Sequence, residues 1–168
     1  MDTLHTNRGD TLITVHRQEN VDNKKRFIGI LKGLEALNNE FNIPLIYPIH
    51  PRSKKNIHEF GIEVNAGIRL IDPVDFLDFL KLESCARLVL TDSGGVQEET
   101  CILGVPCVTL RDNTERPGTI EVGSNILAGT EPLMIMKCAK NMLKKGNGWE
   151  NPYGDGKASE RIVEIIER

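Results

Sequence analysis

Short, continuously apolar segments that alternate with helical stretches constrain the fold of this chain more than any other feature. Five such segments are predicted to be strands: residues 11–15, 44–49, 68–71, 88–90 and 105–110. Strands that are apolar throughout are buried on both faces, as in a parallel sheet covered by its own crossover helices. The pattern therefore predicts an α/β, doubly wound, Rossmann-like parallel sheet with helices on both faces.

The segments between these strands carry the apolar spacing of helices. Predicted helices cover residues 27–41, 54–60, 73–83, 96–103, 133–143 and 158–167. Asp22 or Asn23 is the expected N-cap of the first of them, and Gly104 is expected to end the fourth. Ile126 and Leu127 are expected to add an edge strand. At 168 residues, the chain fits one ordinary domain, residues 1–168.

Composition argues against several classes of function. The net charge is -3, from 24 acidic and 21 basic residues spread along the chain, so we expect no nucleic-acid partner. The sequence has no apolar run near the roughly 20 residues of a membrane span, and its polar start is unlike a signal peptide. We therefore expect a cytoplasmic protein without membrane contact. The four cysteines are too far apart for a metal knuckle and are expected to be buried structural thiols, with no metal site.

Polar residues follow four of the predicted strands. These strand ends are residues 16–20, 50–52, 92–95 and 111–117, and the first of them is expected to be a loop. In a parallel sheet the carboxyl ends of the strands meet at one rim, where ligands bind. Each cluster alone also fits ordinary capping and solvation. Their joint placement favours a binding site on that rim.

The strongest of the four clusters is the turn Ser93-Gly94-Gly95 before a predicted helix. Free backbone N–H groups and the positive end of the helix dipole favour an anion there. The turn matches neither a dinucleotide fingerprint nor a P-loop. The alternative to an anion site is a purely structural tight turn with Ser93 as N-cap. Of the acids that follow, Glu98 and Glu99 point in different directions on the helix. Only one of them can reach the vicinal diol of a ribose.

Basic side chains on the same rim suit phosphate oxygens. Arg17, Arg52, Arg111 and Arg116 can each pair with phosphate, and His16 can donate a proton or a hydrogen bond. A single loop histidine is often incidental. The residue types therefore leave the role of His16 open.

Three stretches together resemble the non-hydrolysing UDP-N-acetylglucosamine 2-epimerases. They are residues 14–20, 92–99 and 114–117, and a weaker stretch covers residues 72–79. The resemblance implies one half of a GT-B-like enzyme, in which this chain is the UDP-binding C-terminal domain and the N-terminal partner domain is absent. It also implies a reaction without cofactor or metal, and a homodimer as an open alternative for the full-length enzyme.

The resemblance assigns roles to individual residues. Ser93, Gly94 and Gly95 would hold the diphosphate, and Glu99 would hold the ribose. Arg116 and His16 would line the nucleotide-sugar site. Val74, through its backbone, and Phe79 would border the uracil.

The reaction of this family interconverts UDP-N-acetylglucosamine and UDP-N-acetylmannosamine by elimination and re-addition of UDP. His16 would be catalytic by stabilising the departing diphosphate, whereas the acidic catalytic residues belong to the missing half. We therefore expect this chain alone to bind UDP weakly at best and to be inactive. Two departures from the family pattern, Gly118 in place of Glu and Val74 in place of Gln, bear on substrate detail.

Several alternatives stay open at the level of the sequence. They include a hydrolysing epimerase, an epimerase of a diacetamido-uronic acid nucleotide, a glycosyltransferase half, and a non-catalytic nucleotide-binding module. The apolar residues of the last helix, Ile162, Val163, Ile165 and Ile166, suit either the core of this domain or a contact with the missing domain. We expect the former.

Overall fold

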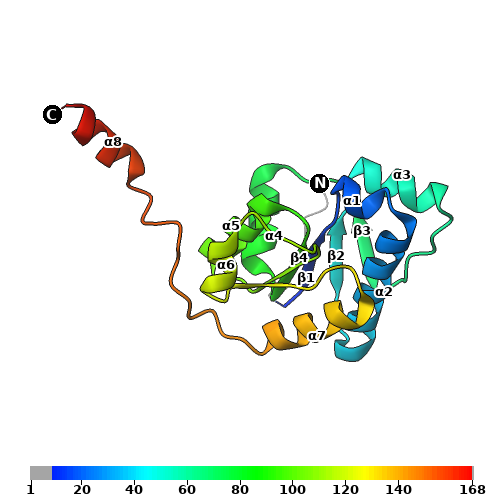
Figure 1. The fold of residues 1–168 in the computed structure, drawn as a ribbon. Helices are drawn as coiled ribbons and strands as arrows, with labels where there is room; N and C mark the ends of the chain where they lie inside the picture. The colour runs from blue at the N-terminus through cyan, green and yellow to red at the C-terminus, as the bar shows by residue number, and fades with distance from the viewer. Residues whose placement is uncertain (1–8, 168) are drawn as a thin grey trace.

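The computed structural model describes residues 9–167 and contains a six-stranded, fully parallel sheet (Figure 1). The strands are β1 (Thr11–Thr14), β2 (Leu45–Pro48), β3 (Ile68–Ile71), β4 (Leu88–Thr91), β5 (Cys107–Thr109) and β6 (Asn125–Leu127). Their order in the sheet is β3-β2-β1-β4-β5-β6. The predicted doubly wound sheet is therefore confirmed, and β6 is an edge strand as expected.

Eight helices connect and follow these strands within residues 9–167. They are α1 (Gln18–Val21), α2 (Lys24–Phe41), α3 (Pro51–Glu59), α4 (Phe76–Cys85), α5 (Gly94–Leu103), α6 (Pro117–Glu121), α7 (Pro132–Leu143) and α8 (Ala158–Ile166). The sequence analysis missed α1, which begins within the predicted loop 16–20, and α6. Helices of four or five residues are too short to show an apolar period.

The ends of the longer helices follow local chemistry. The Asn23 side chain accepts a hydrogen bond from Arg26 N at 3.2 Å, so Asn23 rather than Asp22 caps α2. Gly104 has a φ of 72°, a left-handed conformation that suits glycine, and it ends α5 as expected. Helix α3 begins at Pro51, earlier than predicted, because His50 Nδ1 accepts from Arg52 N and proline fits the first helical turn.

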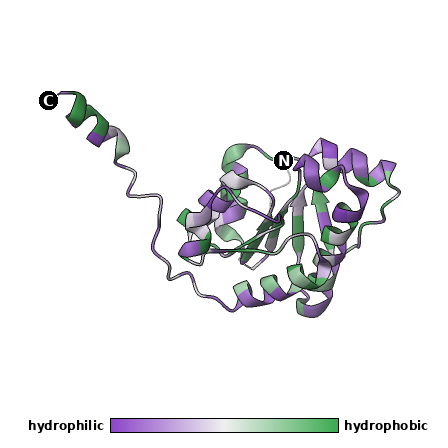
Figure 2. Ribbon diagram, viewed as in Figure 1, coloured by the Kyte–Doolittle hydropathy of each residue, from purple (hydrophilic) through white to green (hydrophobic). Residues whose placement is uncertain are grey.

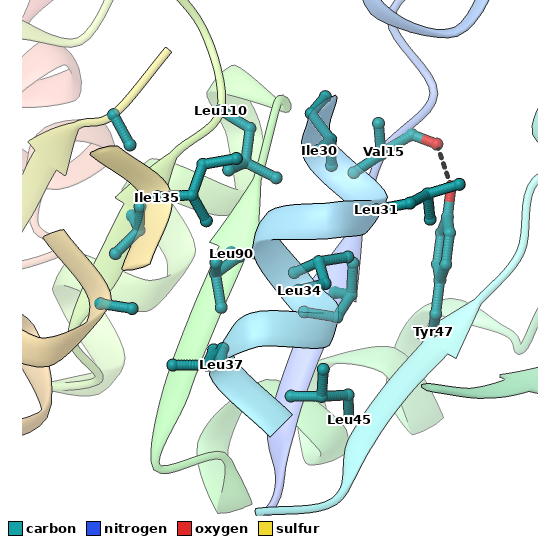
Figure 3. Packing of buried hydrophobic residues seen from close by; sticks show 14 of the residues in the cluster. Val15, Ile30, Leu31, Leu34, Leu37, Leu45, Tyr47, Leu90, Leu110 and Ile135 are labelled. Atoms are coloured by element: carbon teal, nitrogen blue, oxygen red, sulfur yellow. Dashed lines mark hydrogen bonds between the residues drawn. The ribbon is translucent and has the colours of Figure 1, made fainter. Parts of the chain in front are cut away.

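The larger part of the core lies between the sheet and helices α2 and α7. Leu34 and Leu37 of α2 are fully buried against the strands (Figure 3). A Cβ at Gly33 would lie 2.9 Å from Ile135 Cδ1, so this glycine lets α2 and α7 approach closely. The hydropathy colouring shows the apolar strands enclosed between helices (Figure 2). This face is a continuous apolar core.

A smaller apolar cluster fills the opposite face of the sheet. It consists of Leu12, Leu82, Val89, Val96 and Val105, with Ile71, Val74, Phe79 and Ala86 packed at its edge. Helices α4 and α5 supply its outer layer. The two faces together explain why the strands carry apolar residues without alternation.

Helix α8 corrects the expectation for the last helix. An extended segment carries α8 away from the rest of the domain (Figure 1), and α8 buries none of its residues against the described chain. Ile162, Val163, Ile165 and Ile166 are 52–77% exposed, so they do not belong to this domain's core. Periodicity shows that a helix has an apolar face but not what covers that face.

The cysteines differ in burial. Cys101, Cys107 and Cys138 are buried free thiols, as expected. Cys85 is only half-buried at the end of α4, so the expectation of full burial is wrong for this residue. Apolar neighbours in the sequence do not guarantee burial here, because the last turn of a helix is partly exposed to solvent.

We predict that Leu34→Ala lowers the free energy of unfolding by about 2–5 kcal/mol, because it leaves a cavity in a fully buried site. Leu133→Ala is the matched control, since Leu133 is 85% exposed, and it should change stability by less than about 0.5 kcal/mol. Urea denaturation followed by circular dichroism measures both variants. Equal losses would contradict the placement of α2 in the core.

Candidate functional site

The sheet changes direction between β1 and β4, and the candidate site lies at that point. From β1 the chain builds outward through β2 and β3, and from β4 it builds the other way through β5 and β6. In open parallel sheets such a switch point leaves a crevice at the carboxyl ends of the strands. Thr14 and Thr91 end the two strands side by side, with their hydroxyl oxygens 2.6 Å apart. The residues that follow them, His16 and Asp92, therefore face each other.

Asp92 joins the segments that leave β1 and β4. Its carboxylate is fully buried and accepts hydrogen bonds from the backbone N–H groups of His16 and Arg17 and from the Asn20 side chain, at 2.9–3.2 Å. His16 Nδ1 lies 3.6 Å from Asp92 Oδ1, while the His16 side chain is 40% exposed. The carboxylate thus fixes the backbone of His16 at the rim, while the imidazole stays partly open to solvent.

The turn Ser93-Gly94-Gly95 opens α5 at the same rim. Gly94 and Gly95 are the first residues of the helix, and Ser93 stands at its N-cap position. Among the described residues no side-chain bond from Ser93 caps the helix, so the first-turn N–H groups stay available. Backbone donors at a helix N-terminus form an anion site.

Two guanidinium groups flank this turn. A Cβ built on Gly94 would lie 3.9 Å from Arg17 Nη2, 3.9 Å from Arg116 Cζ and 3.5 Å from Glu115 Oε2. Arg116 Nε lies 2.6 Å from Glu98 Oε1, but their angle is not that of a hydrogen bond, so the buried Nε lacks an aligned acceptor within residues 9–167. An incoming anion can supply that acceptor.

The other two arginines have structural partners. Arg111 is buried, and its guanidinium donates to Glu115 and Glu19 at 2.8–3.0 Å. The hydrogen bonds that Arg111 donates to Glu115 raise the pKa of Arg111 further, and the same bonds lower the pKa of Glu115. Arg52 pairs with Asp22 at 3.1 Å on α3. Neither arginine is placed at the anion-binding turn.

An apolar pocket of about 220 Å³ adjoins the turn. Its lining residues are Thr14, His16, Pro48, His50, Pro73, Val74, Phe79 and Val96. The structure thus brings His16, Val74 and Phe79, three of the predicted site residues, into one pocket. The His16 and His50 rings lie 5.8 Å apart, centroid to centroid, at its polar end. A flat heterocyclic ring suits a pocket that is apolar along its walls and polar at one end.

Buried amides hold the loop that carries Arg116. Gln97 Oε1 accepts hydrogen bonds from Thr114 Oγ1 at 2.5 Å and from Asn125 Nδ2 at 3.2 Å. Thr114 Oγ1 accepts from Arg116 N at 2.9 Å. The sequence analysis assigned no role to Gln97, Asn125 or Asp92, because a single polar residue in an apolar stretch does not show which partner it meets. For such a residue, the one available signal in the sequence is a position inside a recognised motif, as for Asp92 and Gln97 in the stretch 92–99.

The two acids on α5 are in different environments. Glu98 faces Arg116, as described above, whereas Glu99 turns toward α4, where it contacts Glu83. Both side chains are half-buried. The expectation that the two acids point in different directions is therefore confirmed.

Residues 9–167 contain no cluster of three or more His, Cys, Asp or Glu side chains placed to bind a metal ion. In the same part of the chain, no helix is both long enough and apolar enough to span a bilayer.

The fold and the site define a Rossmann-like domain with an anion-binding helix start beside an apolar pocket at the switch point of its sheet. Comparison with known proteins narrows this class. Residues 2–167 match the family described as UDP-N-acetylglucosamine 2-epimerase. The UDP-N-acetylglucosamine 2-epimerase of Methanocaldococcus jannaschii is 52% identical over an alignment of 159 residues that covers 92% of this chain and 43% of that protein. This chain therefore belongs to the UDP-N-acetylglucosamine 2-epimerase family, as a C-terminal half.

Other relatives define the breadth of the similarity. The crystal structure of the M. jannaschii enzyme in complex with UDP-GlcNAc and UDP has a TM-score of 0.89 at 49% identity, and covers 96% of this chain and 46% of that one. The UDP-2,3-diacetamido-2,3-dideoxy-D-glucuronate 2-epimerase of Pseudomonas aeruginosa is 38% identical, over 97% of this chain and 46% of that protein. The E. coli heptosyltransferase WaaC with ADP shares only the fold, at 15% identity and a TM-score of 0.56. The chain spans less than half the length of these relatives.

We predict that Asp92→Ala lowers the free energy of unfolding by about 1–3 kcal/mol, because it strips the buried N–H donors of His16 and Arg17 of their acceptor. The matched control is Asp72→Ala, since Asp72 is 89% exposed and its ion pair with Lys54 should contribute less than about 1 kcal/mol. Chemical denaturation measures both. A stability loss no larger for Asp92 than for Asp72 would contradict its bridging role.

Proposed function

We propose that this chain is the UDP-binding part of an enzyme that interconverts UDP-N-acetylglucosamine and UDP-N-acetylmannosamine. The observation that carries the proposal is the Ser93-Gly94-Gly95 helix start, flanked by Arg17 and Arg116 at the switch point of the sheet. The 49% identical M. jannaschii enzyme, whose structure is a complex with UDP-GlcNAc and UDP, supports the choice of ligand. The proposed reaction requires neither a cofactor nor a metal.

The parts of UDP match the parts of the site. The diphosphate would lie on the N–H groups of Gly94 and Gly95 and accept a hydrogen bond from the Ser93 hydroxyl, with Arg116 exchanging Glu98 for a phosphate oxygen. Glu99 would accept hydrogen bonds from the ribose hydroxyls. The uracil would occupy the apolar pocket beside Val74 and Phe79.

His16 would act on the departing diphosphate. Cleavage of the anomeric C–O bond leaves negative charge on UDP, and donors aimed at that charge lower the barrier. Because Asp92 holds the backbone of His16 and faces its Nδ1, the opposite ring edge is directed toward the open rim. The base that removes the proton at C2 of the sugar would come from the half of the enzyme that this chain lacks.

We also propose that the missing N-terminal domain covers α8. The apolar residues Ile162, Ile165 and Ile166 are 57–77% exposed on a helix that extends away from the domain. Burial of such a face against the other half would hold the two domains together. A homodimer of the full-length enzyme and a cytoplasmic location stay predictions.

The double variant Ser93→Ala/Glu99→Ala tests the assignment of the site. It should weaken UDP binding at least about 30-fold, because two hydrogen-bonding contacts worth about 1 kcal/mol each or more are lost. Isothermal titration calorimetry of this chain with UDP measures the effect. Ser84→Ala/Glu63→Ala, at two exposed positions, is the matched control and should bind UDP as the unmodified chain does. Undisturbed binding in the site variant would refute the assignment.

A second candidate substrate is a UDP-diacetamido-uronic acid. The observation that favours this substrate is the 38% identity to the P. aeruginosa enzyme, which extends over 97% of this chain. A non-catalytic nucleotide-binding module and a hydrolysing epimerase are the remaining alternatives.

Product analysis separates these alternatives. The full-length enzyme that contains this chain should convert UDP-N-acetylglucosamine into UDP-N-acetylmannosamine, detected by NMR, and should leave the diacetamido-uronate nucleotide unchanged. Release of free N-acetylmannosamine and UDP would instead indicate hydrolysis. The 168-residue chain alone should show no conversion, and turnover by it would contradict the need for a second half.

A further inference from the structure

One buried acid has no part in the site described so far. Glu83, in the last turns of α4, is 0% exposed, and both its carboxylate oxygens lack a hydrogen-bond donor within residues 9–167. Burial without donors strongly disfavours an ionised carboxylate. Glu83 therefore belongs in its neutral form, which has an O–H group to donate.

The position of Glu83 connects it to the nucleotide pocket. On α4, Glu83 follows Phe79 by four residues, and on α5, Glu99 follows Val96 by three, so each acid lies one turn below a residue that lines the pocket. Helices α4 and α5 pack against each other on this face of the sheet. The two acids consequently meet between the helices, directly beneath the pocket.

The carboxyl group of Glu99 lies within hydrogen-bonding reach of Glu83. Two carboxylates cannot accept from each other, so the contact forms only when one of them carries a proton. Burial, and then the negative charge of Glu99, raise the pKa of Glu83 to about 8. Within residues 9–167, the Cys107 thiol on β5 also interacts with Glu83, and burial raises the pKa of this thiol to about 12, so it stays uncharged.

We propose that neutral Glu83 donates a hydrogen bond to the Glu99 carboxylate and thereby fixes the acid that receives the ribose hydroxyls. Glu83 is thus a positioning residue for recognition of a ribonucleotide. The inference rests on the proposed function, because it concerns the partner of the proposed ribose-binding acid. A Glu side chain held in one conformation binds a diol without first losing its rotamer freedom.

Discrimination between UDP and 2′-deoxy-UDP tests this role, since a merely structural residue would not change it. Calorimetry of the 168-residue chain should show UDP binding about tenfold tighter than 2′-deoxy-UDP, the effect of one well-placed hydrogen bond to a charged group. Glu83→Gln keeps a donor and should keep this ratio. Glu83→Leu keeps the bulk without a donor and should bring the ratio within about twofold of one. Glu63→Leu, at an exposed position, is the control.

The pH dependence of the same ratio provides a second readout. Ionisation of phosphate and uracil affects both nucleotides equally, so it cancels in the ratio. Between pH 7 and pH 9 the ratio should fall in the unmodified chain, because Glu83 loses its proton as the pH rises through about 8. In Glu83→Gln the ratio should stay constant.

Different outcomes separate failure of this inference from failure of the proposed function. If folded Glu83→Leu still prefers UDP as the unmodified chain does, the positioning role is wrong. If the full-length enzyme that contains this chain binds neither nucleotide, the proposed ligand is wrong, and the pair is then tested in the 168-residue chain by ¹³C NMR of the glutamate carboxyl carbons. A Glu83 resonance that titrates near pH 8 together with a response of Glu99 supports the pair. Titration of both near the ordinary pKa of glutamate overturns it.

The stability of the chain provides the remaining check if Glu83→Leu does not fold. Because the pKa of Glu83 is raised in the folded state, its protonated form stabilises the fold below the ordinary pKa of glutamate, and that contribution is lost as the pH rises through about 8. Glu83→Gln should remove this loss, so its melting temperature relative to the unmodified chain should rise between pH 5 and pH 9. Parallel pH profiles would overturn the inference.

Discussion

The buried carboxylate of Asp92 is the interaction on which the rest of the site depends. It stands directly after β4 and accepts hydrogen bonds from the residues that leave β1, so it closes the switch point of the sheet. Those bonds fix the backbone of His16 and Arg17, and Asn20 links the same carboxylate to Leu110 O at the end of β5. Three strand ends therefore share one anchor, and the catalytic and phosphate-binding candidates are placed by it.

Around this anchor the charges are balanced within the domain. Glu98 occupies Arg116, and Glu115 lies between Arg17 and Arg111. An anion arriving at the first turn of α5 would replace carboxylates that already hold the arginines near the required place. Such exchange lets basic side chains stay ordered without a ligand, and the helix N-terminus supplies donors that need no rearrangement.

The sequence predicted the succession of strands and long helices along the chain correctly, because each carries enough apolar residues to show its pattern. It did not predict α1 or α6, and it favoured the wrong environment for α8. Within the site, the motif around Ser93 was visible as a turn before a helix. The contacts of Asp92, Gln97 and Glu83 were not visible, since each joins residues of separate elements, and a buried polar residue has no local signature of its partner.

The sequence by itself determined the class of fold and the family, since apolar strands between helices permit few arrangements and the motifs at the strand ends are specific in combination. Only the tertiary structure decided which polar residues meet. It placed His16, Val74 and Phe79 in one pocket, turned Glu98 to Arg116 and Glu99 to Glu83, and left the apolar face of α8 uncovered by the described chain. The physical reason is that helix and strand periods are local, whereas hydrogen bonds and burial depend on elements brought together by packing.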